Sequence, residues 1–270
     1  MTLVIIGPVT QDLVVIGEKS THKIGGATYF QSFVFEKFYN DYLAIVNCSD
    51  EKIANEFPSK DKVKVILKEF THFFINNYPD VNNKDYREQL SNFVQIPIFK
   101  SDLEKILPKK IDGFVINPLN RHDFPIETID YLKSFNVPIF ISIQGFLRIP
   151  DVEVNGKYAI KLGTFDKLSD ILEGVSSIFL DEGEANITGI DFDVDEVVIT
   201  DGSNGSRIIS DNHETKINAV KCENIADATG CGDTYMAAYI SKRLNDYSIR
   251  SSGEFASDIS SKKLTKFGHY

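Results

Sequence analysis

Short apolar runs alternate with helical segments from Gly113 onward, and this alternation constrains the fold more than any other feature. GFVIN, PIFISI, SIFLD and EVVITDG have the length and composition of buried strands. PIETIDYLKSF, TFDKLSDILEGV and EGEANIT lie between them and have helical spacing. Strands joined through helices pair in parallel. The sequence therefore predicts an α/β fold with a mostly parallel central sheet covered by helices.

The amino-terminal part predicts three more buried strands, at 3–7, 13–17 and 43–47, and a helix that begins after two glycines in GGATYFQSFVFEKF. Between residues 60 and 94, KVKVILK and THFFIN are β-rich with polar interleaving, which predicts an antiparallel pair exposed on one face. GSRIIS and ETKINAV predict a hairpin. Helices are expected at about 233–244 and 248–260.

Composition limits the classes of function. With 270 residues, 42% of them hydrophobic, the chain can bury the core of one large domain. A net charge of −10 without a basic cluster argues against nucleic acid or an anionic membrane as partner. Three scattered cysteines give no disulfide framework, and no signal segment or membrane span is recognisable. We expect a cytoplasmic protein.

DATGCGD, residues 227–233, predicts an anion site. Gly230, Cys231 and Gly232 precede a helix, where unpaired amides and the helix dipole favour phosphate. Asp233 would repel that phosphate, unless it accepts a proton from a hydroxyl that attacks it. Alternatively, Asp233 is only an N-cap. Cys231 could also be a nucleophile, although no histidine is tied to it in the sequence.

Two further motifs follow predicted strands. In ITDGSNGSRI, Thr200, Gly202 and Gly205 form either a simple turn or a ligand loop at the carboxyl end of a strand. In FLDEGEAN, Asp181 and Glu184 either hold Mg²⁺ through water or are ordinary acids at a helix start.

The amino-terminal motif combines Asp12 with Gly25 and Gly26. An aspartate and exposed amides can hold vicinal hydroxyls of a sugar or polyol, and the alternative is a loop aspartate with a tight turn. The five histidines have no metal-ligand spacing, and neither a P-loop nor a GxSxG motif occurs.

These motifs together resemble the ribokinase-like (PfkB) carbohydrate kinases. DATGCGD resembles the signature D-[TP]-T-G-A-G-D of that family, with cysteine in place of alanine. VITDGSNGS resembles its T-x-G-x-x-G nucleotide loop, FLDEGEA its N-x-x-E motif, and GPVTQD and GGATYF its sugar-binding elements. The matches run in family order from residue 7 to about 244.

The resemblance implies an ATP-dependent kinase that phosphorylates a hydroxyl of a sugar, polyol or nucleoside. It implies one domain over 1–270, built as a three-layer sandwich with a small β lid from segments at about 13–24 and 60–95. Asp233 would be the base, and the amides of Gly230, Cys231 and Gly232 the anion hole. The alternative is a catalytically silent sugar- or nucleotide-binding regulatory protein on the same fold.

The remaining roles also follow from the resemblance. Thr200, Gly202 and Gly205 would line the nucleotide, Asp181 and Glu184 would act on phosphate and Mg²⁺ with Glu184 nearest the metal, and Asp12, Gly25, Gly26 and Tyr29 would line the acceptor site. Asp227 falls where some members bind a monovalent cation. The short segment after the signature predicts an adenine pocket that is incomplete or built differently. The lid predicts a homodimer through its β layer.

Overall fold

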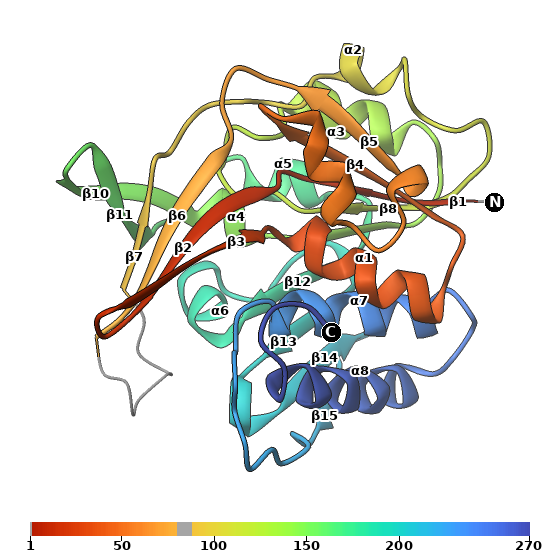
Figure 1. Cartoon of the computed structure of the whole chain (residues 1–270). Helices are drawn as coiled ribbons and strands as arrows, with labels where there is room; N and C mark the ends of the chain where they lie inside the picture. The colour runs from red at the N-terminus through yellow and green to blue at the C-terminus, as the bar shows by residue number, and fades with distance from the viewer. Residues whose placement is uncertain (1, 80–87) are drawn as a thin grey trace.

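The computed structural model describes residues 2–79 and 88–270, and a nine-stranded sheet forms its centre (Figure 1). The strand order is β15-β14-β13-β12-β9-β8-β1-β4-β5. The seven strands from β13 to β5 pair in parallel, and β14 and β15 extend the sheet as an antiparallel hairpin. The strands are β1 (Thr2–Ile6), β4 (Tyr42–Cys48), β5 (Val63–Leu67), β8 (Ile111–Ile116), β9 (Ile139–Ser142), β12 (Val175–Asp181), β13 (Val194–Thr200), β14 (Ser206–Ser210) and β15 (His213–Ile217).

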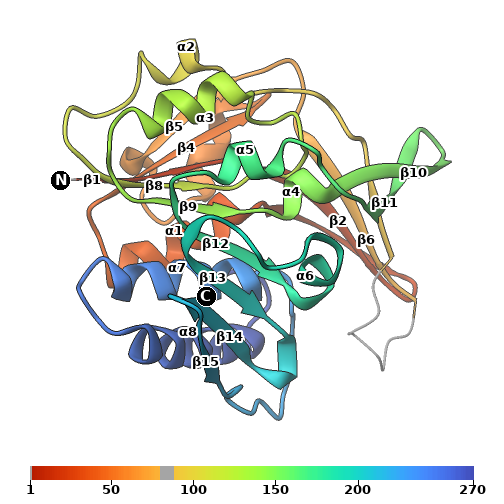
Figure 2. The ribbon, with the colours of Figure 1, turned by 180° about the vertical axis from the view of Figure 1, so that it is seen from behind.

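Helices cover both faces of this sheet (Figures 1 and 2). One face packs against α1 (Ala27–Phe38), α7 (Cys231–Arg243) and α8 (Ile249–Leu264). The other packs against α2 (Lys100–Leu103), α3 (Ile126–Lys133), α4 (Gln144–Leu147), α5 (Leu168–Leu172) and α6 (Glu182–Thr188). In β1, Leu3 and Ile5 join the first core while Val4 and Ile6 join the second. Strands buried on both faces are apolar throughout, and the predicted three-layer α/β architecture is confirmed.

Short 3₁₀ helices lie at Glu51–Glu56, Lys60–Lys62 and Gly202–Asn204. Within residues 2–79 and 88–270, no helix has both the length and the apolar character that crossing a membrane requires.

A second, six-stranded sheet extends from one side of the body, and we call it the lid sheet (Figure 1). Its order is β10-β11-β7-β6-β2-β3, with β2 and β6 parallel and the other pairs antiparallel. Its strands are β2 (Thr10–Ile16), β3 (Lys19–Gly25), β6 (His72–Tyr78), β7 (Glu88–Ser91), β10 (Arg148–Val154) and β11 (Lys157–Leu162). The segment 13–24 therefore lies in this second sheet, and its role as a lid stays a prediction.

The predicted pairing of KVKVILK with THFFIN is wrong. KVKVILK contains β5, which pairs in parallel with β4 at the edge of the large sheet, whereas THFFIN contains β6 of the lid sheet. In β5, Val63 is buried in one core and Ile66 in the other, so the strand contributes to both cores although Lys64 and Leu67 are exposed. Residues 80–87 of the predicted lid segment 60–95 lie outside the described residues. Strands β10 and β11, which complete the lid sheet, were not predicted.

Candidate active site

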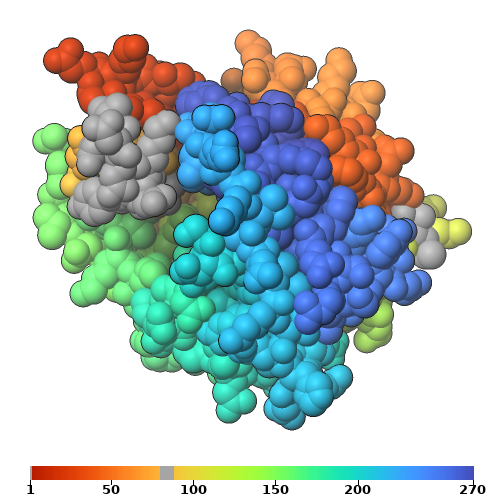
Figure 3. All heavy atoms as spheres, turned by 90° about the horizontal axis from the view of Figure 1, so that it is seen from below, coloured from red at the N-terminus to blue at the C-terminus, as the bar shows by residue number. Residues whose placement is uncertain are grey.

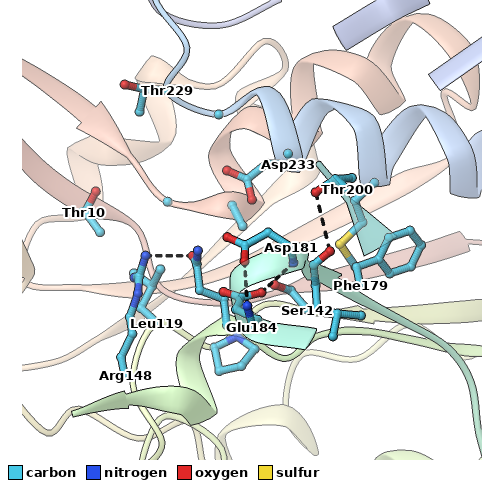
Figure 4. A pocket seen from close by; sticks show the side chains of 18 of the residues that line it. Thr10, Leu119, Ser142, Arg148, Phe179, Asp181, Glu184, Thr200, Thr229 and Asp233 are labelled. Carbon is cyan, nitrogen blue, oxygen red and sulfur yellow. Dashed lines mark hydrogen bonds between the residues drawn. The ribbon is translucent and has the colours of Figure 1, made fainter. Parts of the chain in front are cut away.

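A cavity of about 360 Å³ lies between the lid sheet and the large sheet (Figure 4). The lid sheet contributes residues at one side, and the carboxyl ends of β9, β12 and β13 contribute residues at the other. Open α/β sheets bind ligands at this edge. The lining includes Thr10, Asp12, Phe74, Gln89 and Arg148 from the lid sheet, and Ser142, Asp181, Glu184, Thr200, Gly230, Gly232 and Asp233 from the body.

In the space-filling view from below (Figure 3), carboxyl-terminal segments in blue form the centre of the face. Lid segments in red and green form its left edge. Asp12 and Asp233 both line the cavity, so segments from the two ends of the chain meet there.

The turn before α7 has the geometry of an anion site. Gly230 is the N-cap in the left-handed region, with φ +79°, and a Cβ there would lie 2.5 Å from the ring of Phe30. Only glycine accommodates both constraints. At Gly232, which is exposed, a Cβ would meet nothing within 4 Å. A ligand can therefore approach the backbone at the positive end of the helix dipole.

The amide of Cys231 already donates to the carbonyl of Ala228, at 3.2 Å. An anion hole at this turn is therefore centred on the amides of Gly230 and Gly232, and the predicted contribution of Cys231 requires that bond to be shared.

Asp233 lies in the first turn of α7, and its carboxylate points into the cavity (Figure 4). The N-cap of this helix is Gly230, so the alternative reading of Asp233 as the N-cap is wrong. A carboxylate beside an anion turn and inside a ligand cavity is placed to take a proton from a bound hydroxyl.

Cys231 is not among the described residues that line the cavity with Asp233. Cys231 lines a second, smaller cavity, and its Sγ lies 4.0 Å from the carbonyl of Ser260. Burial raises the pKa of the Cys231 thiol to about 11. Because the thiolate is the nucleophilic form, this environment argues against Cys231 as a nucleophile.

Asp181 and Glu184 form a capping box at the start of α6. The Asp181 carboxylate accepts from the Glu184 amide at 2.8 Å, and the Glu184 carboxylate accepts from the Asp181 amide at 2.9 Å. Glu184 is only 2% exposed. Burial, and next the charge of Asp181, raise the pKa of Glu184 to about 7. A bound cation would offset both effects.

These two carboxylates fit Mg²⁺, which usually takes one or two protein carboxylates and completes its shell with water and substrate phosphates. Among residues 2–79 and 88–270, no group of three or more His, Cys, Asp or Glu side chains forms a closed metal cage. The chemistry of the site therefore suits a cation shared with a phosphorylated ligand.

The predicted nucleotide-loop residues lie together around the second cavity, whose volume is about 130 Å³. Thr200 ends β13, Gly202 is the first residue of the 3₁₀ helix that follows, and Gly205 is its C-cap. Thr200 and Gly232 line both cavities, so the two cavities meet beside the anion turn.

Asp12 belongs to a buried polar network in the lid sheet. Its carboxylate accepts from the Thr10 hydroxyl at 2.5 Å and from the Asn76 amide at 3.3 Å, and Gln89 donates to Asn76 at 2.7 Å. Gly25 allows this arrangement, since a Cβ there would lie 2.7 Å from the Asp12 carboxylate. Gly26 lines the cavity itself.

The sequence prediction missed Thr10, Asn76, Gln89 and Arg148. Asn76 lies within the β-rich run THFFINNY, and a polar residue in such a run was the available signal. Gln89 lies in a largely polar stretch and gave no comparable signal. Arg148, next to the cavity, donates to Gln144 at 2.7 Å (Figure 4).

Tyr29 is not among the described residues that line the cavity, and its predicted role in acceptor binding is wrong. Its ring packs edge-on against Phe33 and Phe57, with centroids 5.2 and 5.3 Å apart. The helix α1 begins at Ala27, and the position of Tyr29 on its first turn directs the ring into the helical layer. The adjacent Phe30 supports the anion turn instead.

Asp227 is paired with two lysines. Lys23 Nζ lies 3.0 Å from its Oδ2, and Lys263 Nζ donates to its carbonyl at 2.8 Å and lies 3.8 Å from Oδ2. Although burial alone would raise it, Lys23 and Lys263 hold the pKa of Asp227 below its ordinary value. Two ammonium groups therefore stand where the resemblance placed a monovalent cation.

Known proteins agree with this architecture. Residues 166–270 match the family model of pfkB family carbohydrate kinase. The resemblance to this family is confirmed. A nucleoside kinase from Methanocaldococcus jannaschii is 28% identical over 148 residues, which are 46% of this chain and 49% of that relative, so the match spans about half the length of each.

Solved structures match over nearly the whole chain. A pyrophosphate-dependent kinase of the ribokinase family, complexed with a pyrophosphate analogue and myo-inositol, has a TM-score of 0.79 at 23% identity, over 99% of this chain and 96% of that one. The ribokinase of Arabidopsis thaliana, complexed with ribose and ATP, has a TM-score of 0.71 at 16% identity, over 99% and 93%. At these identities the likeness shows the fold, which is the ribokinase fold.

Proposed function

We propose that the protein is a kinase that transfers a phosphoryl group to a hydroxyl of a sugar, polyol or nucleoside. The observation that carries the proposal is one cavity lined by Asp233, by the anion turn at Gly230 and Gly232, and by Asp12 of the lid sheet. A base, a phosphate site and a hydroxyl site are the parts that phosphoryl transfer needs.

In the proposed reaction, the lid sheet holds the acceptor through Asp12 and its neighbours, and the turn at Gly230 and Gly232 holds the terminal phosphoryl group. The acceptor oxygen forms a bond to phosphorus as the bond to the leaving phosphate breaks, and Asp233 takes the hydroxyl proton. Mg²⁺ held by Asp181 and Glu184 would neutralise phosphate charge. Positioning and electrostatics supply most of the acceleration.

The lid-sheet network supports a polyhydroxy ring as acceptor. Asp12, Asn76 and Gln89 together offer carboxylate and amide groups to several neighbouring hydroxyls, while Phe74 supplies one apolar wall. The structural neighbours were solved with myo-inositol and with ribose, and the sequence relative is a nucleoside kinase. The sequence prediction named ATP as donor.

The base can be tested with Asp233→Asn, which keeps the shape of the side chain. We expect kcat to fall by roughly 10²–10⁴-fold, as for a lost general base, with the protein folded. The matched control is Asp246→Asn, just beyond the other end of α7, which should keep wild-type turnover. The assay is product formation over a panel of sugars, polyols and nucleosides. Near-wild-type turnover in Asp233→Asn would refute the assignment, and no turnover by the wild type on any acceptor would favour the silent regulatory protein.

A further inference from the structure

Hydrogen bonds close the groove between the segment 218–231 and helix α8. The Ser257 hydroxyl donates to the carbonyl of Asn218 at 2.9 Å and accepts from the amide of Val220 at 3.2 Å. The Ser260 hydroxyl donates to the carbonyl of Cys231 at 3.1 Å. Two turns of α8 are thus tied to the chain that leads into the anion turn.

The carboxyl-terminal end of α8 is also hydrogen-bonded to this segment. The Ala226 amide donates to the carbonyl of Leu264 at 2.8 Å, and Lys263 Nζ donates to the carbonyl of Asp227 at 2.8 Å. These bonds narrow the groove between residues 218–231 and α8 to the second cavity, which Val220, Ser257 and Ser260 line.

The cavity that remains is small. Its volume is about 130 Å³, whereas pockets for drug-sized ligands hold about 300–1,000 Å³. It adjoins the predicted nucleotide loop at Thr200, Gly202 and Gly205, on the side of the anion turn opposite the lid sheet. A phosphate group fits this space, but an additional ribose and base do not.

The charge around the turn suits a compact, highly charged anion. The Lys263 side chain is fully buried, and its ammonium group donates to the carbonyl of Asp227, at the start of the segment that leads into the turn. Lys23 approaches the same segment from the lid sheet through Asp227. The Asp227 carboxylate lies against both ammonium groups and offsets one of the two charges. The remaining positive charge and the dipole of α7 favour an anion at the turn.

We propose that the phosphoryl donor is inorganic pyrophosphate, bound with Mg²⁺ between the anion turn and Thr200, in place of a nucleoside triphosphate. The proposal rests on the kinase function above and revises the predicted donor, ATP. In the reaction, the acceptor oxygen bonds to one phosphorus, the bridging P–O bond breaks, orthophosphate leaves, and the hydroxyl proton passes to Asp233. One structural neighbour is a pyrophosphate-dependent kinase, although the closed groove carries the inference here.

Donor binding can be measured without knowing the acceptor. Calorimetry of the full chain with Mg²⁺ would compare methylenediphosphonate, a stable pyrophosphate analogue, with the β,γ-imido analogue of ATP. We expect the diphosphonate to bind tighter by about tenfold or more. Equal or tighter binding of the ATP analogue, or no binding of the diphosphonate, would overturn the proposal.

Neighbouring lysines of α8 provide a matched pair of variants. Lys263→Met should weaken diphosphonate binding by about tenfold or more, because the loss of this ammonium leaves the Asp227 carboxylate paired with Lys23 alone and makes the charge beside the turn more negative. Lys262→Met, whose ammonium pairs with Asp258 on the surface, should bind as the wild type does. Circular dichroism checks folding, and Lys263→Arg keeps the charge if the methionine variant does not fold. Wild-type affinity in folded Lys263→Met would contradict the charge argument.

Turnover separates this proposal from the kinase function. Radiolabelled pyrophosphate and γ-labelled ATP are offered with the acceptor panel. Transfer from pyrophosphate alone supports both proposals, and transfer from ATP refutes the donor assignment while the kinase function stands. Diphosphonate binding without labelled product from either donor refutes the kinase function and leaves a pyrophosphate-binding site.

Discussion

Glu184 is held in an environment that favours its neutral form. Its pKa is raised from 4.5 to about 7, chiefly by burial. Between these two values the folded protein binds more protons than the unfolded chain, so the contribution of Glu184 to stability falls as pH rises from about 4.5 to 7. The full shift corresponds to a cost of about 3 kcal/mol above pH 7. A cation bound nearby would therefore stabilise the charged form of Glu184.

Glu184→Gln should remove this pH dependence. Glutamine can still accept the bond from the Asp181 amide but has no charge to bury. We expect the free energy of unfolding of the variant, relative to wild type, to increase between pH 5 and pH 8 by about 1–3 kcal/mol. Urea unfolding at both pH values measures it, with the exposed Glu173→Gln as control. An identical pH dependence in wild type and Glu184→Gln would show that Glu184 is not perturbed.

At the scale of secondary-structure elements, the packing of α1 against α7 links the core to the anion turn. Phe30 of α1 lies directly below Gly230, the N-cap of α7. The conformation of this turn therefore depends on a helix that begins two hundred residues earlier in the chain. The segment GGATYF, predicted to bind the acceptor, thus also supports the turn before α7.

Two alanine variants of the turn should separate packing from ligand binding. Gly230→Ala places a methyl group against Phe30 at positive φ and should destabilise the fold by about 1–3 kcal/mol. Gly232→Ala enters open space within a helix and should leave stability unchanged or slightly raised, by up to about 1 kcal/mol, while it obstructs ligand approach. Thermal unfolding and diphosphonate calorimetry distinguish the two. Equal stability of both variants would contradict the role of Phe30.

At the scale of the whole molecule, the lid sheet ends in two edge strands, β3 and β10. Val152 and Val154 of β10 are 64% and 43% exposed. Exposed edges with apolar side chains invite pairing with another chain. The homodimer through the lid sheet remains a prediction, although its first basis, an isolated two-stranded ribbon, does not exist in this fold.

Light scattering at micromolar concentration tests the dimer. We expect twice the mass of the 30.4 kDa chain for the wild type. Val152→Lys should shift the population toward the monomer, because a buried apolar contact becomes charged, and Lys161→Met on the neighbouring strand β11 serves as a surface control. A monomeric wild type, with and without diphosphonate, would rule the dimer out.

Local patterns of this chain, together with the family resemblance, were sufficient for the α/β class, for most helices and strands of the body, and for the positions of Asp233, Thr200, Asp181 and Asp12 around one site. For Asp181 and Thr200 this follows from short-range physics, because apolar periodicity predicts the strand and both residues end parallel strands. Asp233 lies in α7 and Asp12 inside β2 of the lid sheet, and only the family resemblance linked these two residues to the same site. Since the carboxyl ends of parallel strands share one edge, Asp181 and Thr200 are expected close together from the sequence alone.

Tertiary structure alone decided which sheet each polar-apolar strand joins and what each side chain faces. β5 and β6 have similar patterns, yet β5 is an edge strand of the large sheet and β6 lies in the lid sheet. Tyr29 and Phe30 are adjacent, yet one packs among aromatic rings and the other beneath Gly230. The closure of the groove by Ser257, Ser260 and Lys263 likewise depends on how α8 meets a segment far from it in sequence. Such contacts are long-range, and the local sequence on either side does not contain the partner that completes them.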